Sequence, residues 1–144
     1  MPNLFEEADV IYTYTTDMAL SDGLLIDCRQ PAGWSYLNDR TTELVAQHFG
    51  PDLPVYLSRG LAATVEKAVD NKRAHNDVAG VLHDIFSMAF LGRFFNWQNL
   101  QETGASSWQK SFTVKITGIG RRSIVQLLAV VDGDGLFLLY PHER

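Results

Sequence analysis

Residues 112–140 read FTVKITGIGRRSIVQLLAVVDGDGLFLLY, and this stretch decides the fold class. Its first part, Phe112–Thr117, alternates apolar and polar side chains, which is typical of a strand with one solvated face. Ser123–Val131 is apolar on both faces and fits a middle strand, and Leu136–Tyr140 fits a third. In Asp132–Gly135 the Asp-Gly pair favours a tight hairpin, because it tolerates the positive φ angles of a type I′ turn. The stretch therefore predicts a three-stranded antiparallel meander.

The residues before the meander predict the helix that packs on it. Asp77 is a good N-cap, and from Val78 to Phe90 apolar residues recur at i, i+3, i+4 and i+7 spacing. We expect this core helix to run to about Phe95. Shorter helices are expected at Thr41–Phe49 and, with Ser58 as the cap, through to Val69.

The N-terminal part predicts a small β-α-β unit. Val10–Tyr14 is β-branched and aromatic, Asp17–Asp22 suits a short helix, and Leu24–Cys28 is apolar enough for a second strand. Pro54–Leu57 is a further short extended segment. With 144 residues, the chain is expected to be one α+β domain in which the core helix packs on the meander.

Composition favours a globular protein with a protein partner. Hydrophobic residues make up 46% of the chain, charged residues 20%, and the net charge is −5. Its 12 Lys and Arg are scattered, and the only tight clusters are Lys72-Arg73 and Arg121-Arg122. A protein that binds a duplex usually carries a basic stripe, so this distribution argues against direct nucleic-acid binding, and against duplex DNA in particular.

The expected location is the cytoplasm. The opening Met1–Glu7 has neither the basic nor the apolar region of a signal peptide. The longest apolar runs, Met88–Leu91 and Leu136–Tyr140, are too short to span a bilayer. A single cysteine, Cys28, leaves no internal disulfide framework and suits a reducing compartment.

Two glycine-rich turns resemble ligand motifs without completing them. Asp132–Gly135 has the Asp-x-Asp spacing that begins many calcium loops, but the remaining oxygen ligands and the closing Glu are absent, so a hairpin is the better interpretation. Gly118 and Gly120 begin a G-x-G-x-x-G pattern, but Ser123 stands at the third glycine position and no helix follows.

No metal or cofactor is expected. His75 and His83 are eight residues apart, which is not the one-turn spacing of a two-histidine helix site. His83 beside Asp84 cannot easily form a dyad, because adjacent helical residues point in different directions. Cys28 ends a buried strand without an assignable base, so a core thiol is the better interpretation.

Aromatic and arginine side chains are the best candidates for a partner surface. Trp, Tyr and Arg dominate interface hot spots, and several of these residues fall in or beside predicted loops. The alternative is that the loops fold over the core edges and bury their own rings. The candidate residues are Trp34, Tyr36, Trp97, Trp108, Arg121 and Arg122.

Residues 10–27 read VIYTYTTDMALSDGLLID, which resembles a Tyr-Thr, then Ala-x-x-Asp-Gly-x-Leu-x-Asp opening. That opening is found in an uncharacterised family of small proteins from bacteria, plasmids and phages. Pro54–Arg59 is similar to the family's Pro-Val-x-Leu-Thr-Arg segment, and Asp77–Arg93 and Phe112–Thr117 occupy matching places. The resemblance implies a mobile-element setting, in which small acidic proteins often block host defence by binding a host complex.

A second resemblance gives an enzymatic alternative. Tyr12 or Tyr14, Ala19 and Gly23-Leu24 are similar to the first strand and helix of ADP-ribosyltransferases. The interval from strand to glycine is short, and the later Tyr or Ser segment and a catalytic Glu are not found. This alternative implies a small nucleotide- or NAD-using enzyme with a site made of Tyr12, Tyr14, Arg29 and Arg59.

The leading hypothesis is a non-enzymatic protein that binds a host protein or ribonucleoprotein complex and inhibits a CRISPR or restriction system. A homodimer is a further alternative, because strands 123–131 and 136–140 are apolar on both faces. One face must cover the core helix. The other is covered either within the chain or by a second copy.

Overall fold

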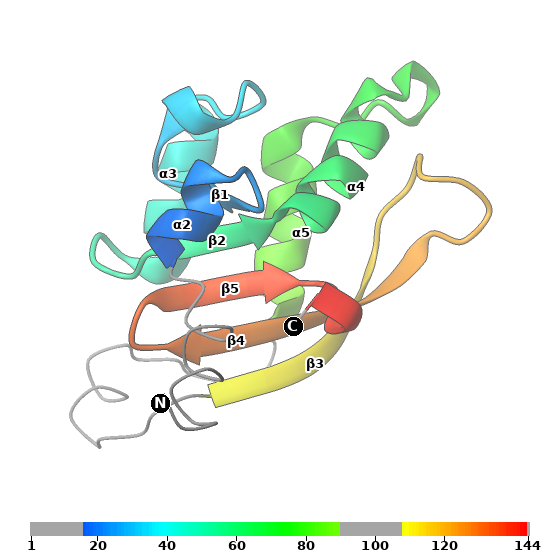
Figure 1. Ribbon diagram of the computed structural model, residues 1–144. Helices are drawn as coiled ribbons and strands as arrows, with labels where there is room; N and C mark the ends of the chain where they lie inside the picture. The colour runs from blue at the N-terminus through cyan, green and yellow to red at the C-terminus, as the bar shows by residue number, and fades with distance from the viewer. Residues whose placement is uncertain (1–15, 90–107, 144) are drawn as a thin grey trace.

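A computed structural model describes residues 16–89 and 108–143 of the chain. Helices with two short strands come first, and three consecutive strands follow, in a single α+β arrangement (Figure 1). The helices are α2 (Thr16–Ser21), α3 (Asp39–Phe49), α4 (Arg59–Asp70) and α5 (Val78–Ala89), with short 3₁₀ turns η1 (Pro31–Gly33), η2 (Lys72–Ala74) and η3 (Pro141–Glu143). The strands are β1 (Leu25–Asp27), β2 (Val55–Ser58), β3 (Trp108–Lys115), β4 (Ile124–Asp132) and β5 (Gly135–Leu139).

The strands form one sheet in the order β1-β2-β5-β4-β3. The predicted C-terminal meander is confirmed, because β3 pairs with β4 and β4 with β5, both antiparallel. The first strand begins at Trp108, earlier than the predicted Phe112, since pairing with β4 continues from Lys115↔Ile124 back to Trp108↔Val131.

The N-terminal strands extend this meander into a mixed sheet. β2 pairs with β5 in parallel, with Tyr56 opposite Phe137, and β1 pairs with β2 antiparallel. The predicted helix at 17–22 and strand at 24–28 match α2 and β1 closely. The predicted strand Val10–Tyr14 lies outside the described residues.

The predicted turn type between β4 and β5 is wrong. Asp132 pairs with Gly135 as expected of a hairpin, but the positive φ falls on Gly135 (137°) and not on the two residues between them. Gly135 also lies against Pro54, whose carbonyl accepts a hydrogen bond from Leu136 N at 2.8 Å. The conformation of Gly135 therefore closes the hairpin and also allows the close contact with Pro54, just before β2.

Side-chain caps begin the main helices where the sequence predicts. Ser58 Oγ accepts a hydrogen bond from Leu61 N at 3.1 Å at the start of α4. Asp77 Oδ1 accepts one from Gly80 N at 2.9 Å at the start of α5. Each cap satisfies a backbone donor that the first helical turn leaves unpaired.

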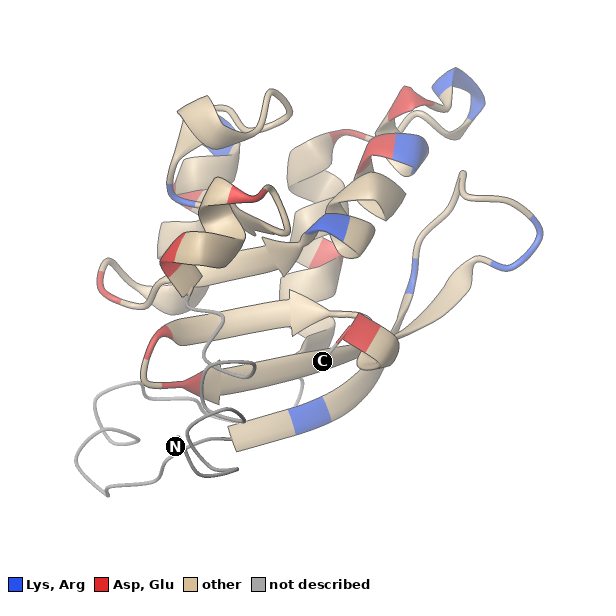
Figure 2. Cartoon of the chain, viewed as in Figure 1, with Lys and Arg blue, Asp and Glu red and all other residues tan. Residues whose placement is uncertain are grey.

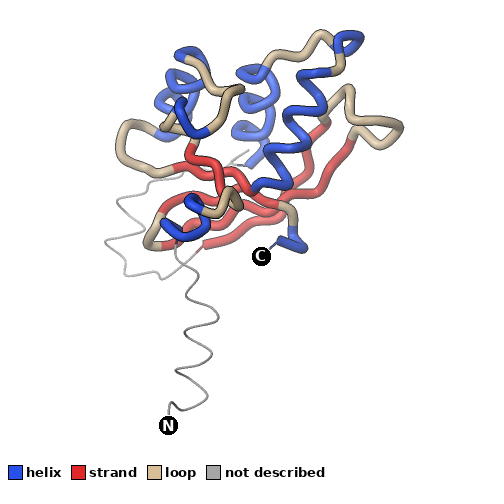
Figure 3. Tube along the Cα trace, turned by 45° about the horizontal axis from the view of Figure 1, so that its top comes forward, coloured by secondary structure: helices blue, strands red, loops and turns tan. Residues whose placement is uncertain are grey.

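Helices α3, α4 and α5 cover one face of the sheet, which the tube in Figure 3 shows as a helical layer above the strands. The core between the layers is apolar, and its largest fully buried side chains include Phe86, Leu57, Leu61, Leu82, Ile85, Leu127, Leu136 and Leu138. The opposite face carries a second, smaller buried cluster of Leu128, Val130 and Leu139, with Phe137 packed against it.

Candidate functional site

The loop that carries two of the candidate aromatic residues folds onto the core. Trp34 is only 5% exposed and belongs to the main core cluster, and its ring stacks on Tyr36 with the centroids 5.4 Å apart. The Tyr36 hydroxyl donates to the Asp70 carboxylate at 2.8 Å, at the end of α4. Trp34 thus contributes packing, and Tyr36 ties the loop to the helix end.

The other two tryptophans lie elsewhere. Trp108 begins β3 and packs, partly buried, against the main core. Trp97 lies outside the described residues. The described part of the chain therefore does not gather the candidate aromatics into one exposed surface.

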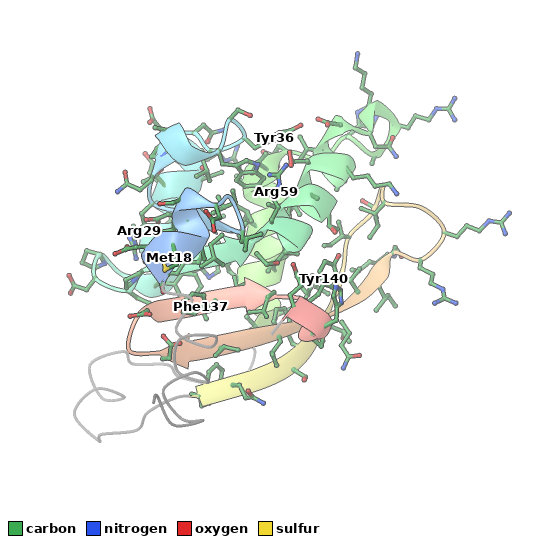
Figure 4. The ribbon with its side chains drawn as sticks, in the orientation of Figure 1. Met18, Arg29, Tyr36, Arg59, Phe137 and Tyr140 are labelled. Carbon is green, nitrogen blue, oxygen red and sulfur yellow. The ribbon has the colours of Figure 1, made fainter. Side chains whose placement is uncertain are left out.

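The two arginines of the alternative nucleotide site are not brought together. Arg29 follows β1, where its guanidinium donates to the carbonyls of Leu53 (2.8 Å) and Gly50 (2.6 Å). Arg59 begins α4 at the other end of the β1–β2 pair and forms an ion pair with Glu66 at 3.3 Å. Figure 4 shows the two labelled side chains apart. Tyr12 and Tyr14 lie outside the described residues.

Four exposed cationic side chains gather at one end of the molecule. Lys72 and Arg73 lie in η2, after α4, and Arg121 and Arg122 lie in the turn between β3 and β4. Figure 2 shows blue on these two neighbouring loops and red on α2 and on the β4–β5 hairpin at the opposite end. We call the four residues the basic end.

Hydrogen bonds hold the two loops of the basic end side by side. Asn71 Nδ2 donates to Gly118 O at 3.1 Å, and Asn76 Nδ2 donates to Thr117 O at 2.8 Å. Gly118 has a φ of +90°, and a Cβ there would lie 2.8 Å from the Ala74 side chain. Only glycine fits this close approach without strain, so the separation of the loops is fixed by the backbone.

Carboxylates converge at the opposite end. Burial and then the charges of Asp27, Asp134, Asp17 and Asp132 raise the pKa of the Tyr56 hydroxyl above its usual value. These four aspartates, which we call the acidic end, come from α2, β1 and the β4–β5 hairpin. Thr16 Oγ1 ties α2 to the hairpin by donating to Asp134 Oδ2 at 2.8 Å.

A third polar group lies where the parallel strands β2 and β5 end. There the Glu143 carboxylate accepts from Ser58 Oγ (2.7 Å), Tyr140 N (2.8 Å) and Gly60 N (3.3 Å). Helix N-termini at the carboxyl edge of parallel strands are common anion sites. Here the chain's own carboxylate already occupies the position, so the group is structural.

A histidine pair joins α3 to α5, and sequence spacing did not reveal it. His48 Nε2 and His83 Nδ1 are 3.1 Å apart. Burial, and then the neighbouring His83, lowers the pKa of His48. An open groove of about 420 Å³ runs beside His83 and is lined partly by Glu43 and Gln47.

Cys28 is a core thiol, as expected. It is fully buried, and burial raises the pKa of its thiol, which keeps it protonated and unreactive at neutral pH. Within residues 16–89 and 108–143, no three His, Cys, Asp or Glu side chains converge in a geometry that could hold a metal ion.

Comparisons of the chain with protein-family models, with curated proteins and with solved structures found no match. In the described part of the chain, no helix combines the length and the apolar character needed to cross a bilayer.

Proposed function

We propose that this chain is a non-enzymatic, cytoplasmic binding protein of a mobile genetic element that inhibits a host defence complex of the CRISPR or restriction type. The separation of charge between its two ends is the observation that carries the proposal. The sequence resemblance to small phage and plasmid proteins supplies the setting.

The acidic end suits a basic partner surface. Defence complexes that process nucleic acid carry cationic surfaces for phosphates. Four aspartates drawn from three elements present the opposite charge on a compact support. Complementary charge speeds encounter and selects partners. Occupying such a surface would exclude the nucleic acid and inhibit the complex without any chemistry.

An apolar side chain accompanies the acidic end. Met18, next to Asp17 on α2, exposes 50% of its surface. Interfaces combine a few apolar anchors with a charged rim, and methionine adapts its shape to a partner. The acidic end with Met18 is therefore the surface that we assign to the protein component of the partner.

A phage plating assay tests the proposal. Expression of the chain in bacteria that carry a panel of active CRISPR or restriction systems should raise the plating efficiency of a targeted phage for at least one system. The double variant Asp132→Asn, Asp134→Asn should lose most of that effect, because it removes two charges while retaining oxygen acceptors for the hairpin.

A matched control removes the same charge elsewhere. Glu43→Gln with Asp84→Asn alters exposed helical positions away from the hairpin and should keep the protection. No protection against any system in the panel, together with turnover of NAD or a nucleotide by the purified chain, would contradict the proposal and favour the enzymatic alternative.

A further inference from the structure

The basic end brings together the two cation clusters of an otherwise acidic chain. Lys72-Arg73 and Arg121-Arg122 are far apart in sequence, yet the Asn71–Gly118 and Asn76–Thr117 hydrogen bonds make their loops adjoin. The charges therefore act as one surface, although the net charge is −5.

These cations are available to a ligand. Within the described residues, other arginine side chains have partners: Arg29 donates to backbone carbonyls, Arg40 pairs with Asp77 at 3.8 Å, and Arg59 pairs with Glu66. Over the same residues, no side chain of the basic end forms an ion pair or a side-chain hydrogen bond, and all four residues are exposed.

Nearby charges do not cancel the basic end. The Asp70 carboxylate at the end of α4 accepts a hydrogen bond from the hydroxyl of Tyr36, in the loop that carries Trp34 and Tyr36. Lys115, at the end of β3, adds a fifth exposed cation on the same hairpin as Arg121 and Arg122, and it lines a shallow groove together with Asp84. The five exposed cations on these loops therefore outnumber the two carboxylates beside them, Asp70 and Asp84.

We infer that the basic end binds the phosphate backbone of a single-stranded nucleic acid. Arginine forks match phosphate oxygens in a bidentate manner, and lysines add compact charges. A single strand offers one phosphate per nucleotide, so two adjoining loops can contact successive phosphates.

The surface is built to contact phosphates and not to read bases. Tyr36, an aromatic side chain at this end of α4, places one ring face on Trp34 and donates its hydroxyl to Asp70, so its ring is held in the packing of its own loop. The four cations lie on the 3₁₀ turn η2 and on the β3–β4 turn, and not along one face of an α-helix, as a duplex reader's recognition helix requires. The inference rests on the proposed function, in which the strand would be the RNA of the defence complex.

Fluorescence anisotropy with labelled oligouridine and oligothymidine of equal length tests the inference. Four phosphate contacts predict a slope of about −3 for log K against log salt concentration, because each contact to a single strand contributes about −0.7. Binding should weaken about 50-fold between 50 and 200 mM salt. RNA and DNA should bind within a few-fold of each other.

Two charge-removing pairs locate the contacts. Arg121→Gln with Arg122→Gln, and Lys72→Gln with Arg73→Gln, should each bring the slope to about −1.4 and leave the melting temperature unchanged, since the side chains are exposed. Arg59→Gln is the control, because it removes an exposed cation that lies outside the basic end and already pairs with Glu66.

Three outcomes would overturn the inference. The first is an unchanged slope in both double variants, and the second is a loss in Arg59→Gln as large as theirs. The third is equal binding of polyglutamate, which would assign the basic end to acidic protein. Host-defence inhibition that survives without any oligonucleotide binding would remove this inference and leave the proposed function. Oligonucleotide binding without inhibition of any defence system would remove the proposed function and leave the binding of single strands by the basic end.

Discussion

Glu143 accepts hydrogen bonds from Ser58 Oγ and Gly60 N at the start of α4 and from Tyr140 N after β5, and its charge lies at the positive end of the α4 dipole. Glu143→Gln keeps one oxygen acceptor but removes the charge. We expect a loss of about 0.5–1.5 kcal/mol in the free energy of unfolding. Urea denaturation followed by circular dichroism would measure it.

Glu43→Gln is the matched control for this substitution. Glu43 lies exposed on α3 and should change stability by less than about 0.5 kcal/mol. Equal urea midpoints for the Glu143 variant and the wild type would show that the Glu143 side-chain carboxylate does not stabilise α4.

The histidine pair makes a prediction about pH. The folded state lowers the pKa of His48, first by burial and then through His83, so the unfolded chain binds protons more readily. Stability should therefore be retained above the ordinary histidine pKa of about 6.5 and decline as the pH falls below it.

Melting temperatures between pH 5 and 8 check this behaviour. The decline on acidification should be smaller for His48→Gln than for the wild type, because the substitution removes the titrating group. Melting temperatures of the wild type that rise toward pH 5 in parallel with those of His48→Gln would contradict the role given to His48.

Contacts between residues close in sequence could be predicted from the sequence, and contacts between distant residues could not. The Ser58 and Asp77 caps follow from residue type and position, since each bond spans three residues. The Ser58–Glu143 bond spans 85 residues, and the His48–His83 contact spans 35. No spacing rule reaches across such intervals, so the fold alone reveals them.

At the scale of elements, the junction between β2 and β5 depends on one glycine. Gly135 has a φ of +137°, and a Cβ there would lie 2.6 Å from Pro54 O. Gly135→Ala should therefore lower stability by about 2–3 kcal/mol, because it strains the backbone and pushes the parallel pair apart. Chemical denaturation would measure the loss.

Gly133 provides the control within the same hairpin. It has no positive φ, and a Cβ there would meet nothing within 4 Å. Gly133→Ala should leave stability unchanged or raise it by up to about 1 kcal/mol, since alanine restricts the unfolded chain. Equal losses at both glycines would remove the role given to the contact between Gly135 and Pro54.

Periodicity explains why the meander could be predicted and the complete sheet could not. Strands joined by short turns pair with their neighbours, so residues 112–140 nearly determine the order of β3, β4 and β5. The parallel pairing of β2 with β5 joins segments that are distant in sequence, through a backbone contact that has no side-chain pattern. The same limit applies to the basic end, whose two cation clusters are visible in the sequence while their proximity is not.

At the scale of the whole molecule, the chain buries three apolar side chains on the second face of its sheet, Leu128, Val130 and Leu139, in addition to the main core, so we expect a monomer. Leu138 is fully buried in the main core, and Leu128 is 6% exposed in the smaller cluster on the other face. A lysine at either position would place an unpaired charge in an apolar environment. Leu138→Lys should abolish folding, and Leu128→Lys should lower the melting temperature strongly, with a smaller loss because lysine can extend its charge toward the rim.

Size-exclusion chromatography with light scattering should give a monomer for the wild type at high concentration. A wild-type dimer that Leu128→Lys converts into a stably folded monomer would instead identify this face as a homodimer interface.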